Sequence, residues 1–228
     1  MKPILGNRLL SAAKFVRQGA YFADVGTDHA YLPLFLLSEG VIERAVCSDV
    51  NEGPLNSARK NAEENGLCDK MIFKLSDGAA ELSGLGITDY AICGMGGELI
   101  AAIIDRAPHL KDSSVNLILQ PMTRQAELRR YLASAGFEIL EEAYSFDAGK
   151  YYVCIRAVYN GISKSISDFE AEFGKLGPRA EFSDAKKGYL DVKLRALKRA
   201  SGGKAMAGVT DSPESRLLLE FDEFLKGN

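Results

Sequence analysis

The chain has 228 residues, of which 46% are hydrophobic and 26% are charged, and its formal net charge at pH 7 is −3. This length suits one domain of good size, or one domain with a small appendage, and the composition is ordinary for a globular protein. No apolar run reaches about 18 residues, so we expect no membrane span, and the first residues lack the features of a secretion signal. The four cysteines form no C-x-x-C pair. They are typical of reduced thiols in a cytoplasmic protein and do not indicate a bound metal.

The chain starts with a predicted helix, followed by an apolar strand that stops at a glycine. Apolar residues at helical spacing predict the helix over residues 7–17. Residues 21–25 are apolar apart from one aspartate, as in a buried parallel strand. Gly26 permits a positive φ angle, and Thr27 and Asp28 are helix-capping types, so we expect the next helix to begin there. A strand, a glycine turn and a helix N-terminus are typical of a nucleotide-like site, because the helix N-terminus has unpaired N–H groups.

Short apolar segments then alternate with helical ones. Strands are predicted over residues 45–49, 71–75, 89–93 and 115–119, helices over residues 55–64, 98–107 and 124–135, and a closing β-hairpin over residues 137–146 and 150–159. This order predicts an α/β fold with a mainly parallel, seven-stranded sheet whose last strand is antiparallel. Such a closing hairpin distinguishes a methyltransferase sheet from a dehydrogenase sheet, in which the last strand follows a further helix.

The pattern changes near residue 160, so we divide the chain into residues 1–160 and a small helical domain over residues 161–228. Apolar stripes in the second part predict an antiparallel helical hairpin, with residues 201–203 as a flexible turn. The segment from Lys186 to Lys204 contains seven basic residues and one acidic residue. This excess favours a surface that contacts nucleic-acid phosphates over the simpler alternative, a solvated helix face.

In an open α/β sheet, ligands bind outside the carboxyl ends of the strands. The first strand end offers Asp24, Gly26, Asp28 and His29. A dinucleotide site needs a glycine where this chain has Asp28, and two acidic residues would repel a diphosphate. They suit a ligand that carries an amino group or a sulfonium ion, and S-adenosylmethionine (SAM) fits that description. The simpler alternative is that Asp28 caps a helix and His29 lies on the surface.

The ends of the other strands add polar side chains and glycines whose backbone a ligand can approach closely. Asp49 ends the second strand, where an acidic residue accepts hydrogen bonds from ribose hydroxyls. Asp77-Gly78 follows the third strand, where a carboxylate can accept from an adenine amino group unless it only forms a turn. Residues 94–97 contain three glycines, which either form a tight turn or line the space between a methyl donor and its acceptor. Gln120-Pro121 after the fifth strand is either a pocket wall or an ordinary loop.

Taken together, these segments resemble the TrmK family of bacterial SAM-dependent methyltransferases, which modify N1 of the adenine at position 22 of tRNA. The matching segments are Asp24 to Pro33 (DVGTDHAYLP), Ser48-Asp49-Val50, Gly53-Pro54-Leu55, Ser76-Asp77-Gly78, Gly94-Met95-Gly96-Gly97 and Leu119-Gln120-Pro121. The resemblance covers roughly residues 5–160. It implies a Rossmann-like class I methyltransferase domain with a C-terminal, coiled-coil-like helical domain, SAM as cofactor and tRNA as partner. One departure is Met122, where the family pattern leads us to expect asparagine.

The residue chemistry and the resemblance together assign roles. The expected cofactor-binding residues are Asp24, Gly26, Thr27, Asp28, His29, Asp49, Val50, Asp77, Gly78, Gly94, Met95 and Gly96. The residues expected beside the reacting atoms are Asp28, His29, Gly94 and Met95. The expected tRNA contacts are Tyr31, Arg124, Lys193, Arg195, Lys198 and Arg199, with Arg129 and Arg130 beside Arg124. We expect no membrane and no obligate protein partner.

The reaction expected from this resemblance is an in-line displacement on the sulfonium methyl group. N1 of neutral adenine has a free lone pair, so alignment matters more than a strong base. N1 lies on the Watson–Crick edge, so the base must leave its stack to react. Tyr31 either stacks on that base or faces the core. Two alternatives remain from the residues alone: a class I methyltransferase for another RNA, a protein or a small molecule, and a nucleotide-binding or NAD-dependent protein.

Overall fold

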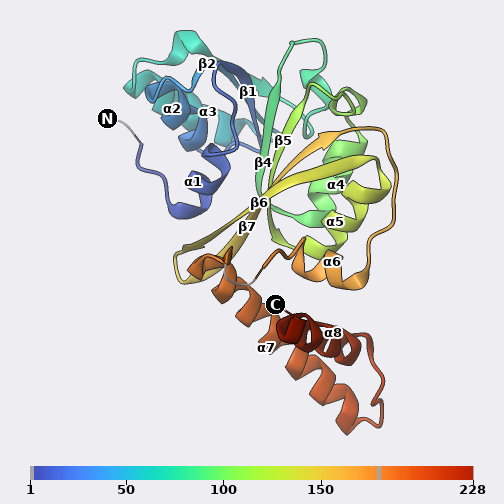
Figure 1. Cartoon of the computed structure of the whole chain (residues 1–228). Helices are drawn as coiled ribbons and strands as arrows, with labels where there is room; N and C mark the ends of the chain where they lie inside the picture. The colour runs from blue at the N-terminus through green and yellow to red at the C-terminus, as the bar shows by residue number, and fades with distance from the viewer. Residues whose placement is uncertain (1–2, 179–180, 228) are drawn as a thin grey trace.

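The computed structural model describes residues 3–178 and 181–227 (Figure 1). Its strands are β1 (Ala20–Val25), β2 (Ile42–Asp49), β3 (Met71–Leu75), β4 (Asp89–Gly96), β5 (Asn116–Thr123), β6 (Phe137–Asp147) and β7 (Lys150–Tyr159). Its α-helices are α1 (Asn7–Ala13), α2 (Tyr31–Ser38), α3 (Glu52–Glu64), α4 (Gly97–Asp105), α5 (Gln125–Ser134), α6 (Asp168–Phe173), α7 (Asp184–Met206) and α8 (Pro213–Gly227). In the described part of the chain, no helix combines the length and apolar character needed to cross a membrane.

All seven strands form one sheet in the order β3-β2-β1-β4-β5-β7-β6. Strands β1 to β5 pair in parallel, and β7 is antiparallel to both β5 and β6. The predicted mainly parallel sheet with a closing antiparallel hairpin is therefore confirmed. The strand order changes direction at β1, between β2 and β4, which is the switch point where α/β sheets bind ligands.

Helices cover both faces of this sheet because the central strands are apolar on both sides (Figure 1). Phe22 packs in the core beneath α1, α2 and α3, whereas Ala23 and Val25 pack in the core beneath α4 and α5. Side chains alternate along a strand, so Asp24 points to the same face as Phe22. Its carboxylate therefore lies on the side covered by α1 and α2.

The turn after β1 differs from the prediction. The N–H groups of Gly26 and Thr27 both donate to the Ser48 carbonyl, at 2.8 and 2.9 Å, so the turn at Gly26 is fixed to the end of β2. Helix α2 begins only at Tyr31, after Ala30 in a left-handed conformation with φ 55°. The prediction that Thr27 and Asp28 cap this helix is wrong, because a turn bonded to β2 and the bends that follow it occupy residues 26–29.

Two other segments at the strand ends belong to strands. Residues 94–96 continue β4, and Gln120-Pro121 lies inside β5. Register shifts near Cys93 and Met95 absorb the extra residues of β4. The glycines thus support an irregular strand end with bulges, and the alternatives of a tight turn at residues 94–97 and of an ordinary loop at Gln120-Pro121 are wrong.

The C-terminal part contains α6, which packs against α5, and the long helices α7 and α8. These two lie side by side and project away from the sheet (Figure 1). Residues 201–203, predicted as a turn, lie inside α7, which ends where the Ala207 N–H bonds back to Gly203 and Lys204. A Cβ atom on Gly202 or Gly203 would meet nothing within 4 Å, so no neighbouring segment packs closely against the helix at these two glycines. Whether residues 161–228 fold as a separate domain stays a prediction.

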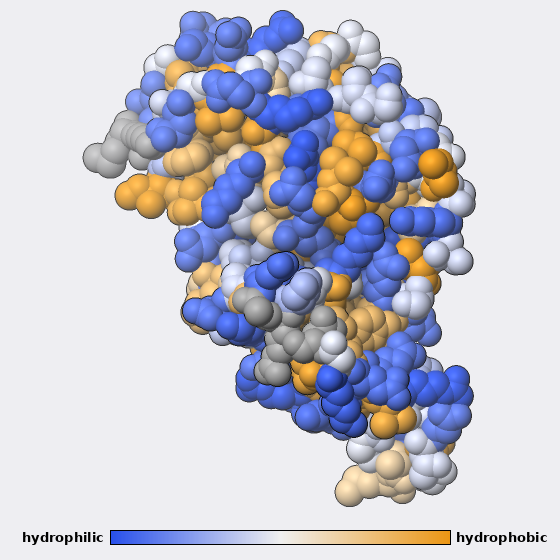
Figure 2. Space-filling model, viewed as in Figure 1, coloured by the Kyte–Doolittle hydropathy of each residue, from blue (hydrophilic) through white to orange (hydrophobic). Residues whose placement is uncertain are grey.

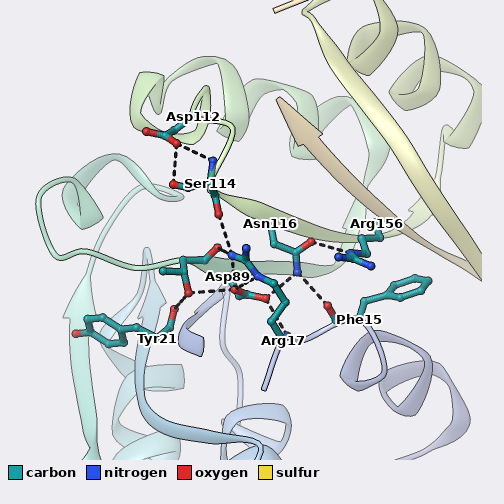
Figure 3. Close-up of polar contacts among 9 residues, drawn as sticks. Phe15, Arg17, Tyr21, Asp89, Asp112, Ser114, Asn116 and Arg156 are labelled. Atoms are coloured by element: carbon teal, nitrogen blue, oxygen red, sulfur yellow. Dashed lines mark hydrogen bonds and ion pairs between the residues drawn. The ribbon is translucent and has the colours of Figure 1, made fainter. Parts of the chain in front are cut away.

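At the amino ends of β4 and β5, opposite the candidate site, polar side chains form a buried network (Figure 3). Asp89 is fully buried and accepts from Arg17 Nε at 2.9 Å, from Arg17 Nη2 at 2.7 Å and from Asn116 Nδ2 at 2.7 Å. Asn116 Oδ1 in turn accepts from Arg156 Nε at 3.1 Å. The network ties the segment before β1 to β4, β5 and β7.

Candidate active site

A cavity of about 390 Å³ lies where the carboxyl ends of β1 and β4 meet α1 and α2. Its polar lining comes from Arg8, Asp24, Asp28 and His29 and from the backbone at Gly26 and Gly94. The structure thus brings five predicted residues of the first and fourth strand ends into one lining: Asp24, Gly26, Asp28, His29 and Gly94. The predicted Thr27, Met95 and Gly96 lie next to these residues in the chain but are not part of the lining. The structure also adds Arg8, which no sequence motif indicated.

Asp24 lies deep in this cavity. The Thr27 hydroxyl donates a hydrogen bond to its carboxylate. Burial, together with the nearby charge of Asp49, raises the pKa of Asp24 to about 6, although the Thr27 hydrogen bond and the positive charge of Arg8 oppose the rise. At pH 7 the carboxylate is mostly ionised but poorly solvated, so a cationic group placed against it gains a strong partner.

The thiols around the cavity are not reactive. Burial raises the pKa of the Cys93 thiol to about 12, and it raises the pKa of Cys47 well above its usual value. All four cysteines are free thiols. The thiols therefore stay protonated and contribute packing.

The loop before α2 forms an open rim. His29 Nε2 lies 3.3 Å from an Asp28 carboxylate oxygen. The rings of His29 and Tyr31 stack, with centroids 5.2 Å apart and an angle of 23° between their planes. Tyr31 is 47% exposed, so the alternative of a core-facing Tyr31 is wrong. A half-exposed aromatic pair beside a carboxylate is suited to receive a flat, partly positive ring.

Glycine backbone forms part of the floor. Gly26 has φ +77°, and a Cβ atom on it would meet the Cε methyl group of Met95 at 2.0 Å. Gly94 has φ +80°, and a Cβ atom there would lie 3.7 Å from Arg8 Nη1. Gly96, the third of these glycines, ends β4. The positive φ angles favour glycine at Gly26 and Gly94, whereas the Met95 methyl group near Gly26 ends a flexible side chain that can move.

The remaining predicted cofactor residues follow β2 and β3 and do not line this cavity. Asp49 Oδ1 accepts from the Asn51 N–H at 2.8 Å, and the neighbouring Val50 is 60% exposed. Asp77 is exposed and forms an ion pair with Arg106 at 3.2 Å. A Cβ atom on Gly78 would lie 2.9 Å from Ile103, so the loop after β3 crosses to α4.

Two residues that sequence reasoning undervalued connect these parts. Gln120 is fully buried, and its Oε1 atom accepts from Arg8 Nη1 at 2.6 Å and from the Gly94 N–H at 3.2 Å. The only sequence signal for Arg8 was its place off the apolar stripe of the first helix. Contact between α1 and β5 is non-local, so no spacing in the sequence announces it.

The predicted nucleic-acid contacts fall into free and paired side chains. Lys193 Nζ lies 2.8 Å from Glu172 and is largely buried, whereas Arg195, Lys198 and Arg199 are exposed and have no ion pair within the described residues. Hydrophilic side chains cover much of the α7–α8 projection (Figure 2). Arg124 is exposed and pairs with Glu127 at 3.0 Å.

The expectation that Arg129 belongs to a basic surface patch is wrong. Its side chain is 1% exposed, and its Nε atom donates to Glu142 at 2.7 Å. Its Nη1 atom donates to the Ala171 carbonyl at 2.8 Å. Arg129 therefore holds α6 against the sheet. Arg130 is exposed and pairs with Asp168 at 2.7 Å.

Comparison with known proteins identifies the family. Residues 5–155 match the family model described as a methyltransferase domain. The tRNA (adenine(22)-N(1))-methyltransferase of Bacillus subtilis (strain 168) is 30% identical over 168 residues, which cover 71% of each chain. The chain belongs to the TrmK family.

Solved structures agree with this TrmK assignment. The structure of Streptococcus pneumoniae Sp1610, a putative tRNA (m1A22) methyltransferase in complex with S-adenosyl-L-methionine, is 33% identical with a TM-score of 0.80, covering 94% of this chain and 100% of that one. M. capricolum TrmK in complex with S-adenosyl-homocysteine is 26% identical with a TM-score of 0.70, covering 97% of this chain and 95% of that one.

The residues of this TrmK chain fit SAM. The cavity lining combines two carboxylates, one guanidinium and open glycine backbone. These charges suit SAM, which carries an ammonium group, a carboxylate and a sulfonium ion. They do not suit a diphosphate, which the two carboxylates would repel. Asp49 keeps one carboxylate oxygen without a partner in the described structure, on the next strand end along the sheet.

Proposed function

We propose that this protein transfers the methyl group of SAM to N1 of the adenine at position 22 of tRNA. The observation that carries the proposal is the juxtaposition of Asp24, Asp28 and the Gly94 backbone around one cavity at the switch point of the sheet. Membership of the TrmK family supports the same reaction. When bound, SAM supplies an electrophilic methyl group on a sulfonium ion.

Residues at the strand ends orient the cofactor in this proposal. Asp24 accepts from the ammonium group of the methionine moiety, and Asp49 accepts from the ribose hydroxyls. Asp77 and Gly78 lie beside the adenine, which requires Asp77 to leave its exposed pair with Arg106. An exposed ion pair contributes about 0–1 kcal/mol, so this exchange costs little.

The rim of the cavity receives the target base. Tyr31, stacked on His29, offers a ring face to the flipped adenine, and each such stack contributes about 1–3 kcal/mol. Methylation makes the adenine cationic, so the exposed Asp28 carboxylate stabilises the charge as it develops. No side chain has to remove a proton from N1 before the transfer, because its lone pair is free in the neutral base.

The body of the tRNA is bound away from the cavity. Arg195, Lys198 and Arg199 on α7 are exposed cations suited to backbone phosphates. Arg124 at the start of α5 adds a further cation near the carboxyl end of β5. A tRNA substrate agrees with a cytoplasmic location for the protein.

Methyl transfer to unmodified tRNA tests the proposal directly. The purified protein is incubated with a tRNA transcript and SAM carrying an isotope-labelled methyl group, and the product is digested and mapped by mass spectrometry. We expect one labelled N1-methyladenine, at position 22. A matched transcript with guanine at that position is expected to stay unlabelled. Absence of label from the first transcript, or equal labelling of both, would contradict the proposal.

A further inference from the structure

A second cavity, of about 170 Å³, lies where α5 and β6 meet α6 and the start of α7. It shares no lining residue with the cavity at the carboxyl ends of β1 and β4. It is therefore a separate space, at the joint between the sheet and the C-terminal helices (Figure 1). The proposed methyl transfer gives this second cavity no role.

The buried guanidinium of Arg129 lines this cavity and has one nitrogen atom left free. Its Nε atom donates to Glu142 at 2.7 Å, and its Nη1 atom donates to the Ala171 carbonyl at 2.8 Å. Its Nη2 atom is buried and has no hydrogen-bond partner among the described residues. A buried donor on a charged group is costly to leave unpaired. Nη2 is therefore the donor left for an acceptor placed in the cavity.

Three lysines line the same cavity and form no ion pair with any described carboxylate: Lys164, Lys175 and Lys186. Lys186 is half-buried at the start of α7, whereas the other two are exposed. Burial, together with the charge of Arg129, lowers the pKa of Lys186, although Glu142 and Glu181 oppose the fall. Two like charges thus act on each other across the cavity, and an anion between them would relieve their repulsion.

The carboxylates of the lining limit the charge that the cavity accepts. Glu141 and Glu142 are each paired with an arginine, at 3.0 and 2.7 Å. Glu170 is half-buried and forms no ion pair with another described residue. Four cations and three carboxylates line the cavity, so the lining has an excess of one positive charge. A single negative charge matches this excess, whereas a dianion would be repelled by the nearby carboxylates.

The apolar part of the lining follows a β-bulge. The pairing of β6 with β7 shifts between Ile139 and Glu141, so Leu140 has no direct partner on β7. Bulges of this kind re-aim side chains and are common beside functional sites. Phe137 and Ile166 complete this wall. A cavity of about 150 Å³ can hold one benzene ring, so this one has room for an apolar group of that size.

We propose that this cavity binds a small organic monoanion, a carboxylate on an apolar body of about one ring, with Arg129 Nη2 and Lys186 as the donors to the carboxylate. This inference does not depend on the proposed methyl transfer. Such a ligand bridges β6, the end of α6 and the start of α7, and so stiffens the joint that carries the exposed cations of α7. Inorganic phosphate is a poorer match, because it has no apolar body and carries more charge.

Saturation-transfer difference NMR on the full chain tests the proposal, with benzoate as the probe and benzamide as its neutral counterpart of similar shape. We expect benzoate to bind with a dissociation constant in the millimolar range and benzamide at least about tenfold more weakly, because a hydrogen bond to a charged group contributes about this factor or more. Saturating S-adenosylhomocysteine is expected to leave benzoate binding unchanged, since the two cavities share no residue.

Lys186→Met removes one of the two proposed donors. It is expected to weaken benzoate binding by about tenfold and to leave benzamide binding as in the wild type. Lys187→Met is the matched control, because Lys187 is the next residue of α7, is exposed and does not line the cavity. It is expected to bind benzoate as the wild type does. Arg129 is not replaced, because its pairing with Glu142 also holds α6 in place.

Several outcomes would contradict the site. Undetectable benzoate binding, equal affinity for benzoate and benzamide, or unchanged benzoate affinity in Lys186→Met overturns the proposal. Displacement of benzoate by S-adenosylhomocysteine would place it in the cavity at β1 and β4 and has the same effect. Tighter binding of inorganic phosphate than of benzoate, measured by competition, overturns the assignment to a carboxylate with an apolar body. The proposed methyl transfer stands or falls separately, with the labelled tRNA.

Discussion

Asp24 is a carboxylate in an unfavourable place. It is surrounded by protein at the end of β1, near Asp49, and its pKa rises to about 6 because burial disfavours the charged form. In the proposed function this carboxylate must be ionised to accept the ammonium group of SAM. The free protein therefore bears a cost in stability that the bound cofactor relieves, as is common where binding sites hold isolated charges.

Replacing Asp24 by asparagine is expected to stabilise the free protein above pH 6. The folded state keeps the Asp24 proton up to about pH 6, whereas the unfolded chain releases it near the ordinary aspartate pKa of 3.8, so the wild type loses stability as the pH rises between these values. Asp24→Asn does not titrate. The free energy of unfolding of the variant is expected to exceed that of the wild type by an amount that grows between the two pKa values and then levels off at about 1 to 3 kcal/mol.

Urea denaturation of wild type and variant between pH 4 and pH 8 measures this difference, a pH range of about two units on each side of the folded pKa. Asp28→Asn is the matched control, because Asp28 is exposed at the rim and is expected to change stability little. A difference between wild type and Asp24→Asn that is constant across the range would contradict the assigned burial cost. The same variant is expected to lose affinity for SAM, since the amide cannot pair with an ammonium group.

At the scale of elements, α4 and α5 approach each other closely at Gly97. A Cβ atom on Gly97 would lie 2.2 Å from the Arg124 carbonyl oxygen and 3.1 Å from Leu128 Cβ. Arg124 is itself in a left-handed conformation with φ 58°, so its backbone has little freedom to move. Gly97 therefore sets how the end of β4 and the start of α5 meet beside the proposed site.

We expect Gly97→Ala to destabilise the protein by about 1–3 kcal/mol, because the added methyl group meets backbone and cannot be accommodated by a rotamer change. Gly53→Ala is the matched control: Gly53 lies near the start of α3, and a Cβ atom there meets nothing within 4 Å. That change is expected to be neutral or to stabilise by up to about 1 kcal/mol. Thermal unfolding followed by circular dichroism compares the two, and equal behaviour would contradict the steric argument.

The order of elements could be predicted from the sequence because it depends on local patterns. Apolar segments of strand length alternate with helical stripes, and the closing hairpin over residues 137–159 has no helix inside it. The Asp24, Asp28 and Gly94 positions could be predicted for the same reason, since the carboxyl ends of parallel strands share one edge of a sheet.

The predictions failed where distant segments decide the local structure. The Ser48 carbonyl from β2 binds the N–H groups of Gly26 and Thr27 in a turn, so α2 begins only at Tyr31. Pairing with β5 draws residues 94–96 into β4. The contact of Arg8 with Gln120 joins residues 112 positions apart, and the burial of Arg129 depends on its pairing with Glu142. None of these partners is encoded in the spacing of neighbouring residues.

At the scale of the whole molecule, the two ends of the central strands have different roles. The proposed site lies at the carboxyl ends of the strands, and the network around the fully buried Asp89 lies at their amino ends (Figure 3). Asp89→Asn removes the charge that the partly exposed Arg17 pairs with and weakens the hydrogen bonds of a fully buried side chain, at a cost of about 1–3 kcal/mol. We expect this loss of stability in urea denaturation, with unchanged S-adenosylhomocysteine affinity by calorimetry. Weaker S-adenosylhomocysteine binding in the folded Asp89→Asn variant would show that the two ends of the strands are coupled.

In the proposed function, the tRNA contacts on the projecting helix α7 lie apart from the site of methyl transfer. Arg195, Lys198 and Arg199 lie on α7, away from the cavity at β1 and β4, and Lys193 is already paired with Glu172. A methyltransferase that acts on one base of a folded RNA needs such a second contact, because the base alone offers little area. The free cations of α7 are therefore expected to govern tRNA affinity without affecting the cofactor.

Reversing the three free charges together, as Arg195→Glu, Lys198→Glu and Arg199→Glu, is expected to weaken tRNA binding by at least about tenfold. Each lost phosphate contact also reduces the slope of log affinity against log salt by about one. Gel-shift titrations at several salt concentrations measure both effects. Lys60→Glu with Lys70→Glu, two exposed lysines on α3 and just before β3, is the matched control and tests for a general charge effect. Unchanged tRNA affinity and salt slope in the α7 variant would assign the phosphate contacts to another face, whereas reduced S-adenosylhomocysteine affinity would mean that α7 supports the cofactor site.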